Sequence, residues 1–149
     1  MTICSSGRSA VIVAAPSAFY TGLIPYLRED ADRPVPRSVR VLTTTMQTVA
    51  LERIDERTVS VRPEGGYLLG LESLFRSRAH LLELNQRIEL PDVKIQITEL
   101  TQQGNPAEAR FQFVAPLEDD SLTWFTWHDG QYKRFTLPPV GGTITLDLW

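Results

Sequence analysis

The chain has 149 residues, a formal net charge of −3, and contents of 42% hydrophobic and 22% charged residues. This length is typical of one domain, and this composition excludes an intrinsically disordered or collagen-like chain. Its arginines are spread along the sequence and interleaved with acidic residues, so they form no basic stripe and we expect no nucleic-acid partner. The sequence therefore predicts a single globular domain, residues 1–149, with no cofactor and no need of a metal or disulfide to fold.

A lone cysteine and short apolar runs narrow the class of protein further. Cys4 is the only cysteine, so neither an intramolecular disulfide nor a cysteine-ligated zinc site is available. The longest apolar run, Ala10–Ala15, is far shorter than the ~20 residues that cross a bilayer as a helix. The N-terminus also lacks the basic region, apolar core and cleavage site of a signal peptide. We therefore expect a chain that is soluble as given.

Residues 1–37 have a pattern of their own. Ala10–Ala15 is continuously apolar, which is typical of a strand buried on both faces. Ser17 then provides the N-cap of a short helix with an apolar stripe. Pro25 breaks that helix, because proline lacks the N–H that a helix interior needs. A charged, proline-containing connector is predicted to follow, extended up to residue 37.

From Ser38 to Trp149 the apolar residues recur with a period of two, as they do in strands that bury one face. This alternation occurs at Val39–Val41, Val49–Leu51, Val59–Val61, Val93–Ile97, Phe111–Phe113 and Ile144–Leu148. Turns are predicted at Asp55–Arg57, Gln103–Pro106, Asp129–Gly130 and Val140–Gly142. The third of these predicts a tight hairpin, because glycine accepts the positive φ that such turns need.

One segment interrupts the alternation. Leu71, Leu74 and Phe75 have helical spacing and predict a helix of two turns, after a loop at Gly65–Gly66. Taken together, the elements predict a mainly β fold, an antiparallel sandwich or partly open barrel of seven to nine strands with one or two short helices. Its antiparallel core is expected over residues 38–149.

The strongest candidate for ligand binding is an aromatic hairpin. Alternation sends Trp124 to one face of its strand and Phe125 and Trp127 to the other, so one ring lies near the surface unless both faces are covered. Exposed rings on a β-sandwich stack on sugars, so we predict Trp124, Trp127 and Tyr132 as ligand-binding residues. The alternative is that these rings are core residues and cross-strand pairs.

Catalytic chemistry has less support in the sequence. Glu118, Asp119 and Asp120 precede a predicted strand that ends near His128, and carboxylates with an imidazole suit a metal site or an acid–base pair. A strand of that length separates its ends by about 20 Å, so the two groups share no ligand unless the strand folds back. A zinc motif such as HExxH is also absent. We predict no catalytic residues and no metal ligands.

Three other features have plainer explanations than chemistry. Ser17 follows a strand but lacks the glycine-flanked elbow of hydrolases, so helix capping accounts for it. Gly65–Gly66 has no following lysine and is a loop without phosphate-loop spacing. Arg76, Arg78 and His80 form either a small anion site or the solvated end of the predicted helix, where cations complement the backbone dipole.

Six ordered segments are familiar from a group of known proteins. They are residues 59–66 (VSVRPEGG), 74–77 (LFRS), 87–91 (RIELP), 106–111 (PAEARF), 116–119 (PLED) and 135–141 (FTLPPVG). Together they resemble the C-terminal soluble region of uncharacterised bacterial multi-span membrane proteins. These motifs are turns and strand edges without a catalytic signature. The resemblance implies an extramembrane domain beyond a bundle of helices that this sequence does not contain, and it supplies no activity.

Three functions are therefore expected, in order. The first is a non-enzymatic β domain that packs against a partner, such as the membrane-embedded part of its own parent protein. The second is a carbohydrate- or ligand-binding sandwich that uses the aromatic hairpin. The third is a metal-dependent hydrolase that uses His128 with the neighbouring acids. Membrane association through upstream helices is left open.

Overall fold

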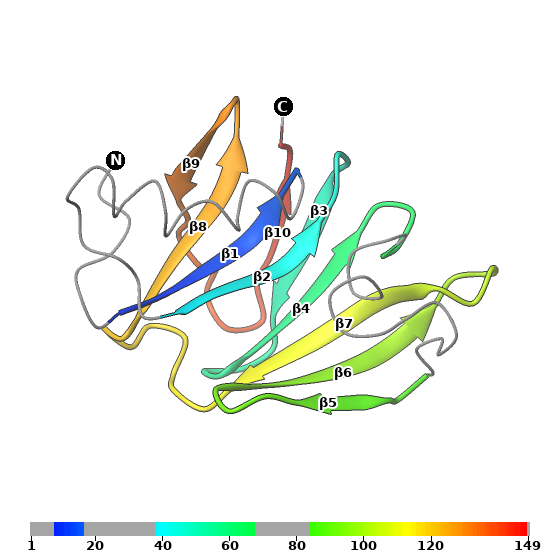
Figure 1. Cartoon of the computed structure of the whole chain (residues 1–149), viewed down its shortest axis with the longest axis horizontal. Helices are drawn as coiled ribbons and strands as arrows, with labels where there is room; N and C mark the ends of the chain where they lie inside the picture. The colour runs from blue at the N-terminus through cyan, green and yellow to red at the C-terminus, as the bar shows by residue number, and fades with distance from the viewer. Residues whose placement is uncertain (1–7, 17–37, 68–83, 149) are drawn as a thin grey trace.

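The computed structural model describes residues 8–16, 38–67 and 84–148. Within them ten strands form two sheets (Figure 1). The strands are β1 (Ser9–Ala15), β2 (Ser38–Thr44), β3 (Val49–Arg53), β4 (Thr58–Pro63), β5 (Arg87–Glu89), β6 (Val93–Leu100), β7 (Pro106–Phe113), β8 (Leu122–His128), β9 (Gln131–Arg134) and β10 (Thr143–Leu146). One sheet has the order β2-β1-β8-β9, and the other has the order β10-β3-β4-β7-β6-β5.

The predicted mainly β fold is confirmed, because each alternating segment of the sequence overlaps a strand. The β8–β9 hairpin turns at Asp129–Gly130, where φ is +50° and +80°, as a tight turn requires. The described residues contain no helix, and the helices predicted near residues 17–27 and 71–78 lie outside them. In the same part of the chain no helix is long and apolar enough to cross a membrane.

The first strand corrects the prediction of an antiparallel sandwich, although it lies outside residues 38–149, where the antiparallel core was predicted. β1 pairs in parallel with β2 on one side and with β8 on the other, so the four-stranded sheet is mixed. The physical reason lies in the apolar run Ala10–Ala15, all of which is buried. A strand that is dry on both faces belongs in the middle of a sheet, and parallel strands are commonly buried in this way. The remaining pairs are antiparallel, as expected.

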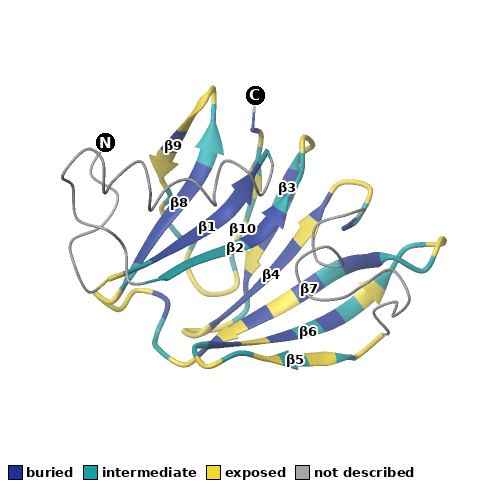
Figure 2. Cartoon of the chain, in the orientation of Figure 1, coloured by how far each residue is buried: buried dark blue, intermediate teal, exposed yellow. Residues whose placement is uncertain are grey.

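The inner faces of the two sheets share one hydrophobic core (Figure 2). Val11 of β1 and Trp124 of β8 enter it from the four-stranded sheet, and Val61 and Phe111 enter it from the six-stranded sheet. Tyr67 also joins the sheets, since its buried hydroxyl donates a hydrogen bond to the Leu42 carbonyl oxygen of β2 at 3.2 Å. The molecule is thus a two-layer β-sandwich.

The two outer faces differ in character. The outer face of the four-stranded sheet is apolar, and Ala10, Ile12 and Phe125 on it are buried. The outer face of the six-stranded sheet carries mostly polar residues, because the alternate residues of its strands are charged or amide side chains. Polar groups in reach of solvent therefore gather on one side of the sandwich.

An ion pair links the edge of the four-stranded sheet to the turn between β5 and β6. Arg40 of β2 donates to both carboxylate oxygens of Asp92, from Nε at 3.1 and 3.0 Å and from Nη2 at 2.6 Å. These hydrogen bonds hold the pKa of Asp92 below its ordinary value. Both side chains are about one-third exposed, so solvent screens part of the attraction.

We expect Asp92→Asn to lower the free energy of unfolding by about 1 kcal/mol at pH 7. Because the folded-state pKa of Asp92 is depressed, this stability is present above the unfolded-state pKa of ~3.9 and is lost as the pH falls through the folded-state pKa. Urea denaturation at pH 7 and pH 2 measures both effects. Asp120→Asn, in an exposed turn, is the control. Equal destabilisation by the two variants at pH 7 would rule out the ion pair as the cause.

Candidate functional site

Register places polar side chains of neighbouring strands in rows on the outer face of the six-stranded sheet. We call the outward residues of this sheet the polar face. One row joins Ser60 of β4, Arg110 of β7, Gln96 of β6 and Arg87 of β5. Side chains directly opposite on adjacent strands lie close enough to act together. The polar face is therefore the surface on which groups from distant parts of the sequence converge.

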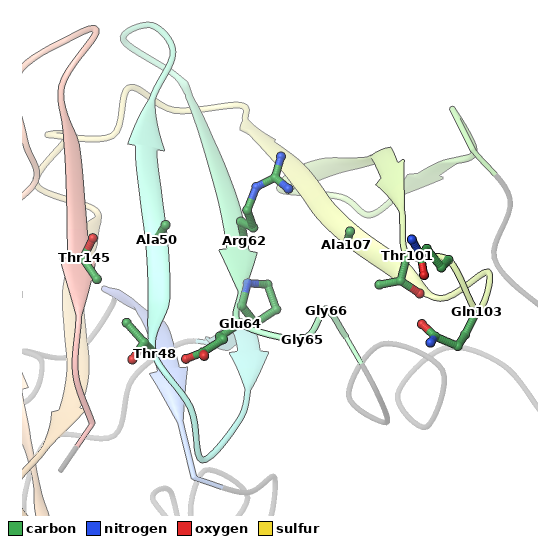
Figure 3. Close-up of a pocket in the computed structure, with 12 residues that line it drawn as sticks. Thr48, Ala50, Arg62, Glu64, Gly65, Gly66, Thr101, Gln103, Ala107 and Thr145 are labelled. Atoms are coloured by element: carbon green, nitrogen blue, oxygen red, sulfur yellow. The ribbon is translucent and has the colours of Figure 1, made fainter.

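A pocket of about 530 Å³ lies at one end of the polar face (Figure 3). Four small residues line it, which leaves the space open: Ala50, Gly65, Gly66 and Ala107. Pro63 and two charged residues, Arg62 and Glu64, also line it. The remaining lining residues have neutral hydrogen-bonding side chains: Thr48, Thr101, Thr145, Gln102 and Gln103. The lining thus comes from four neighbouring strands, β10, β3, β4 and β7, and from the turns beside them.

Two turns in close contact form one wall of this pocket. Gly66 has a φ of +82°, and its N–H donates to the Pro63 carbonyl oxygen at 2.9 Å. The next residue, Tyr67, donates its N–H to the Pro106 carbonyl oxygen at 2.7 Å. A Cβ atom on Gly66 would lie 2.7 Å from Thr101 Cγ2 and 2.9 Å from Pro106 O, so only glycine fits. The interpretation of Gly65–Gly66 as a loop is confirmed, and its packing adds a role in shaping the pocket.

Arg62 extends from β4 over the polar face and is held by two carboxylates. Its Nη2 lies 2.8 Å from Glu108 Oε2 and also bonds Glu99. Burial raises the pKa of Glu108, but hydrogen bonds from Thr98, Ser60 and Arg62 outweigh this and leave the pKa below its ordinary value. Both hydrogen bonds to these carboxylates use Nη2. The N–H groups of Arg62 Nε and Nη1 therefore have no hydrogen bond to another described residue and are available to a ligand.

Comparisons with known proteins give no further identification. No family model, curated protein or solved structure matches the chain. The resemblance to membrane-protein C-terminal regions therefore stays a prediction. Function is inferred from the geometry of the polar face.

The aromatic residues that the sequence singled out lie on β8 and β9, in two different places. Trp124 is 5% exposed in the inter-sheet core, where its indole N–H donates to the Leu117 carbonyl oxygen at 2.7 Å. Trp127 and Tyr132 pair edge to face on the other side of β8, with ring centroids 4.9 Å apart. Burial raises the pKa of Tyr132 to about 12. Both faces of the hairpin are thus largely covered, and ligand binding by these rings stays a prediction.

The acidic cluster and His128 stand at opposite ends of β8. Glu118 accepts a hydrogen bond from the buried Arg53 at 2.7 Å, whereas His128 Nδ1 lies 2.7 Å from the Asp147 carbonyl oxygen. Within the described ranges, no three His, Cys, Asp or Glu side chains group closely enough to hold a metal ion. Other residues considered for chemistry lie outside those ranges: Cys4, Ser17, Arg76, Arg78 and His80.

Sequence reasoning found the two turns, at Gly65–Gly66 and from Gln103, but missed the pocket that they form with residues of the sheet. Ala50 and Arg62 are opposite one another on β3 and β4, and Thr101 lies in a turn some forty positions further along the chain. A signal was present at the outward-facing positions of the alternating strands, which hold small and polar residues. The contact between the two turns has no local signature, so it had to come from the structure.

Proposed function

We propose that this chain is a non-enzymatic β-sandwich domain that binds a carbohydrate in the pocket beside Gly65–Gly66. The observation that carries the proposal is a hollow lined by small residues and surrounded by neutral hydrogen-bonding side chains. Its volume of about 530 Å³ lies within the range of ~300–1,000 Å³ that is usual for small-ligand sites.

The chemistry of the lining suits sugar hydroxyls. A hydroxyl group both donates and accepts hydrogen bonds, and so do the threonine hydroxyls and glutamine amides of the pocket. Arg62 adds donors, yet its charge is balanced by Glu99 and Glu108. With Glu64 also in the lining, this end of the polar face has no excess of positive charge. The pocket can therefore bind a sugar through its hydroxyl groups, without a charge on the sugar.

This proposal retains binding as the role of the domain and places it on the polar face. Packing against the membrane-embedded part of a parent protein is the other proposal for the partner, and it rests on the resemblance alone. The two differ in the size of surface they need. A sugar needs only the pocket, whereas a protein partner requires a contact of ~800 Å² on each side.

Filling the pocket is the test of this proposal. We expect neutral glycans on a broad microarray to bind the wild-type chain, and Ala50→Leu to weaken binding of the best glycan at least tenfold by calorimetry. The added side chain occupies the hollow on the outer face of β3. Glu52→Leu is the control, because it introduces the same side chain two positions further along β3, on the same face but outside the pocket. This variant should bind the glycan as the wild type does.

Two results would contradict the pocket. One is an array without any bound neutral glycan, and the other is full binding by Ala50→Leu. Tryptophan fluorescence separates the pocket from the aromatic hairpin, because the pocket lining contains no tryptophan. Sugar-induced quenching that persists in Ala50→Leu would assign binding to the hairpin instead.

A further inference from the structure

A second hollow, of about 310 Å³, lies toward the other end of the polar face. Cationic and amide side chains from three neighbouring strands line it: Arg87 of β5, Lys94 and Gln96 of β6, and Arg110 and Gln112 of β7. Arg87, Lys94 and Arg110 are exposed. Solvent, and therefore a dissolved ligand, has access to all three positive charges.

Register explains why these cations converge. Arg87 and Arg110 flank Gln96 in one row, and Lys94 lies in the next row between Glu89 and Gln112. The side chains of a row point to the same face, so the three charges surround the amide of Gln96. An anion bound over Gln96 therefore has positive charge on three sides of it.

The cations have no strong partner within the described part of the chain. No ion pair or hydrogen bond joins Arg87, Lys94 or Arg110 to another described side chain. The hollow contains two carboxylates, of which Asp55 accepts the backbone N–H of Arg57 at 2.8 Å. The other, Glu89, faces Lys94 across the strands without an ion pair. Positive charge therefore exceeds negative charge here, on a chain whose net charge is −3.

We propose that this hollow binds the carboxylate groups of an acidic polysaccharide whose sugar rings extend toward the first pocket. The sugar part of this inference rests on the proposed function, whereas the anion site stands on its own geometry. From Ala50 on β3, Lys94 on β6 is three strands across the sheet and about four residues along the strand direction. The two hollows therefore lie roughly 20 Å apart on one face of the sheet. An oligosaccharide of several rings spans both.

The test compares two oligosaccharides of equal length, hexagalacturonate and the neutral maltohexaose, by calorimetry on the full chain. We expect hexagalacturonate to bind at least tenfold more tightly in 50 mM NaCl, and this preference to disappear in 500 mM NaCl because salt screens exposed charges. The double variant Lys94→Gln and Arg110→Gln should lose the preference. The double variant Lys133→Gln and Arg134→Gln, which removes the same two charges from exposed positions on β9 of the other sheet, should keep it.

The outcomes separate this inference from the proposed function. Equal affinity for the two oligosaccharides overturns the anion site and leaves the sugar pocket standing. Tight binding of hexagalacturonate that resists Ala50→Leu but is lost in the double variant supports the anion site and contradicts the pocket. Absence of binding by both oligosaccharides contradicts the anion site. Thermal melting checks folding, and the melting temperature of the Lys94 and Arg110 double variant should not fall, because neither side chain makes an ion pair or hydrogen bond with another described side chain.

Discussion

Replacing Phe111 with alanine is expected to lower the free energy of unfolding by about 3–5 kcal/mol. Phe111 is 2% exposed in the inter-sheet core, and on β7 it stands between Val59 of β4 and Ile95 of β6. Its removal leaves a cavity beneath the centre of the six-stranded sheet, where paired strands resist collapse. Urea denaturation followed by circular dichroism measures the loss.

The neighbouring residue provides the control for this prediction. Arg110 precedes Phe111 on β7 and points to the opposite face, where it is exposed. Arg110→Ala should change the free energy of unfolding by no more than about 0.5 kcal/mol. Two similar losses would mean that β7 does not have one buried and one solvated face. That outcome would overturn both the core and the polar face described above.

Gly66→Ala is expected to lower the free energy of unfolding by about 3 kcal/mol or more, and Gly65→Ala by about 1–2 kcal/mol. Both glycines have positive φ, so alanine is strained at either position. Only Gly66 also meets Thr101 and Pro106 at less than 3 Å, whereas a Cβ on Gly65 has open space around it. The difference between the variants thus isolates the close contact of the two turns.

The same pair of variants connects stability to binding. Because the Gly66 turn forms a wall of the first pocket, Gly66→Ala should also weaken glycan binding, and Gly65→Ala should weaken it less. Calorimetry of each folded variant, at a temperature below its melting transition, measures this effect. Equal losses of stability in the two variants would show that the turns are not in contact. Unchanged binding by Gly66→Ala would separate the turn from the pocket.

The strands were predictable because their signal is local. In β6 and β7 the alternation is strict, and Phe111 and Ile95 point inward as their positions predict. The burial of β1 on both faces was equally visible in its apolar run. Its parallel pairing with β2 and β8 was not visible, because it depends on which strands meet and not on the pattern within any one of them.

The candidate site was less predictable than the fold. Large rings draw attention in a sequence, but Trp124 and Phe125 are largely buried on opposite faces of β8, which the alternation alone does not decide. The pocket has the opposite character, since it is defined by small residues such as Ala50 and Gly66 and by a contact between two turns. A hollow left by small residues can be recognised as a binding site only when the residues that surround it are known.

If the polar face of the six-stranded sheet is the binding surface of this domain, an acidic oligosaccharide should perturb that face and no other. Titration of the ¹⁵N-labelled chain with hexagalacturonate, followed by amide chemical shifts, measures this. We expect the largest shifts at the first pocket, around Gly66 and Thr101, and at the cationic hollow, around Lys94 and Arg110. Shifts concentrated on the β8–β9 hairpin, or no shifts at millimolar ligand, would contradict it.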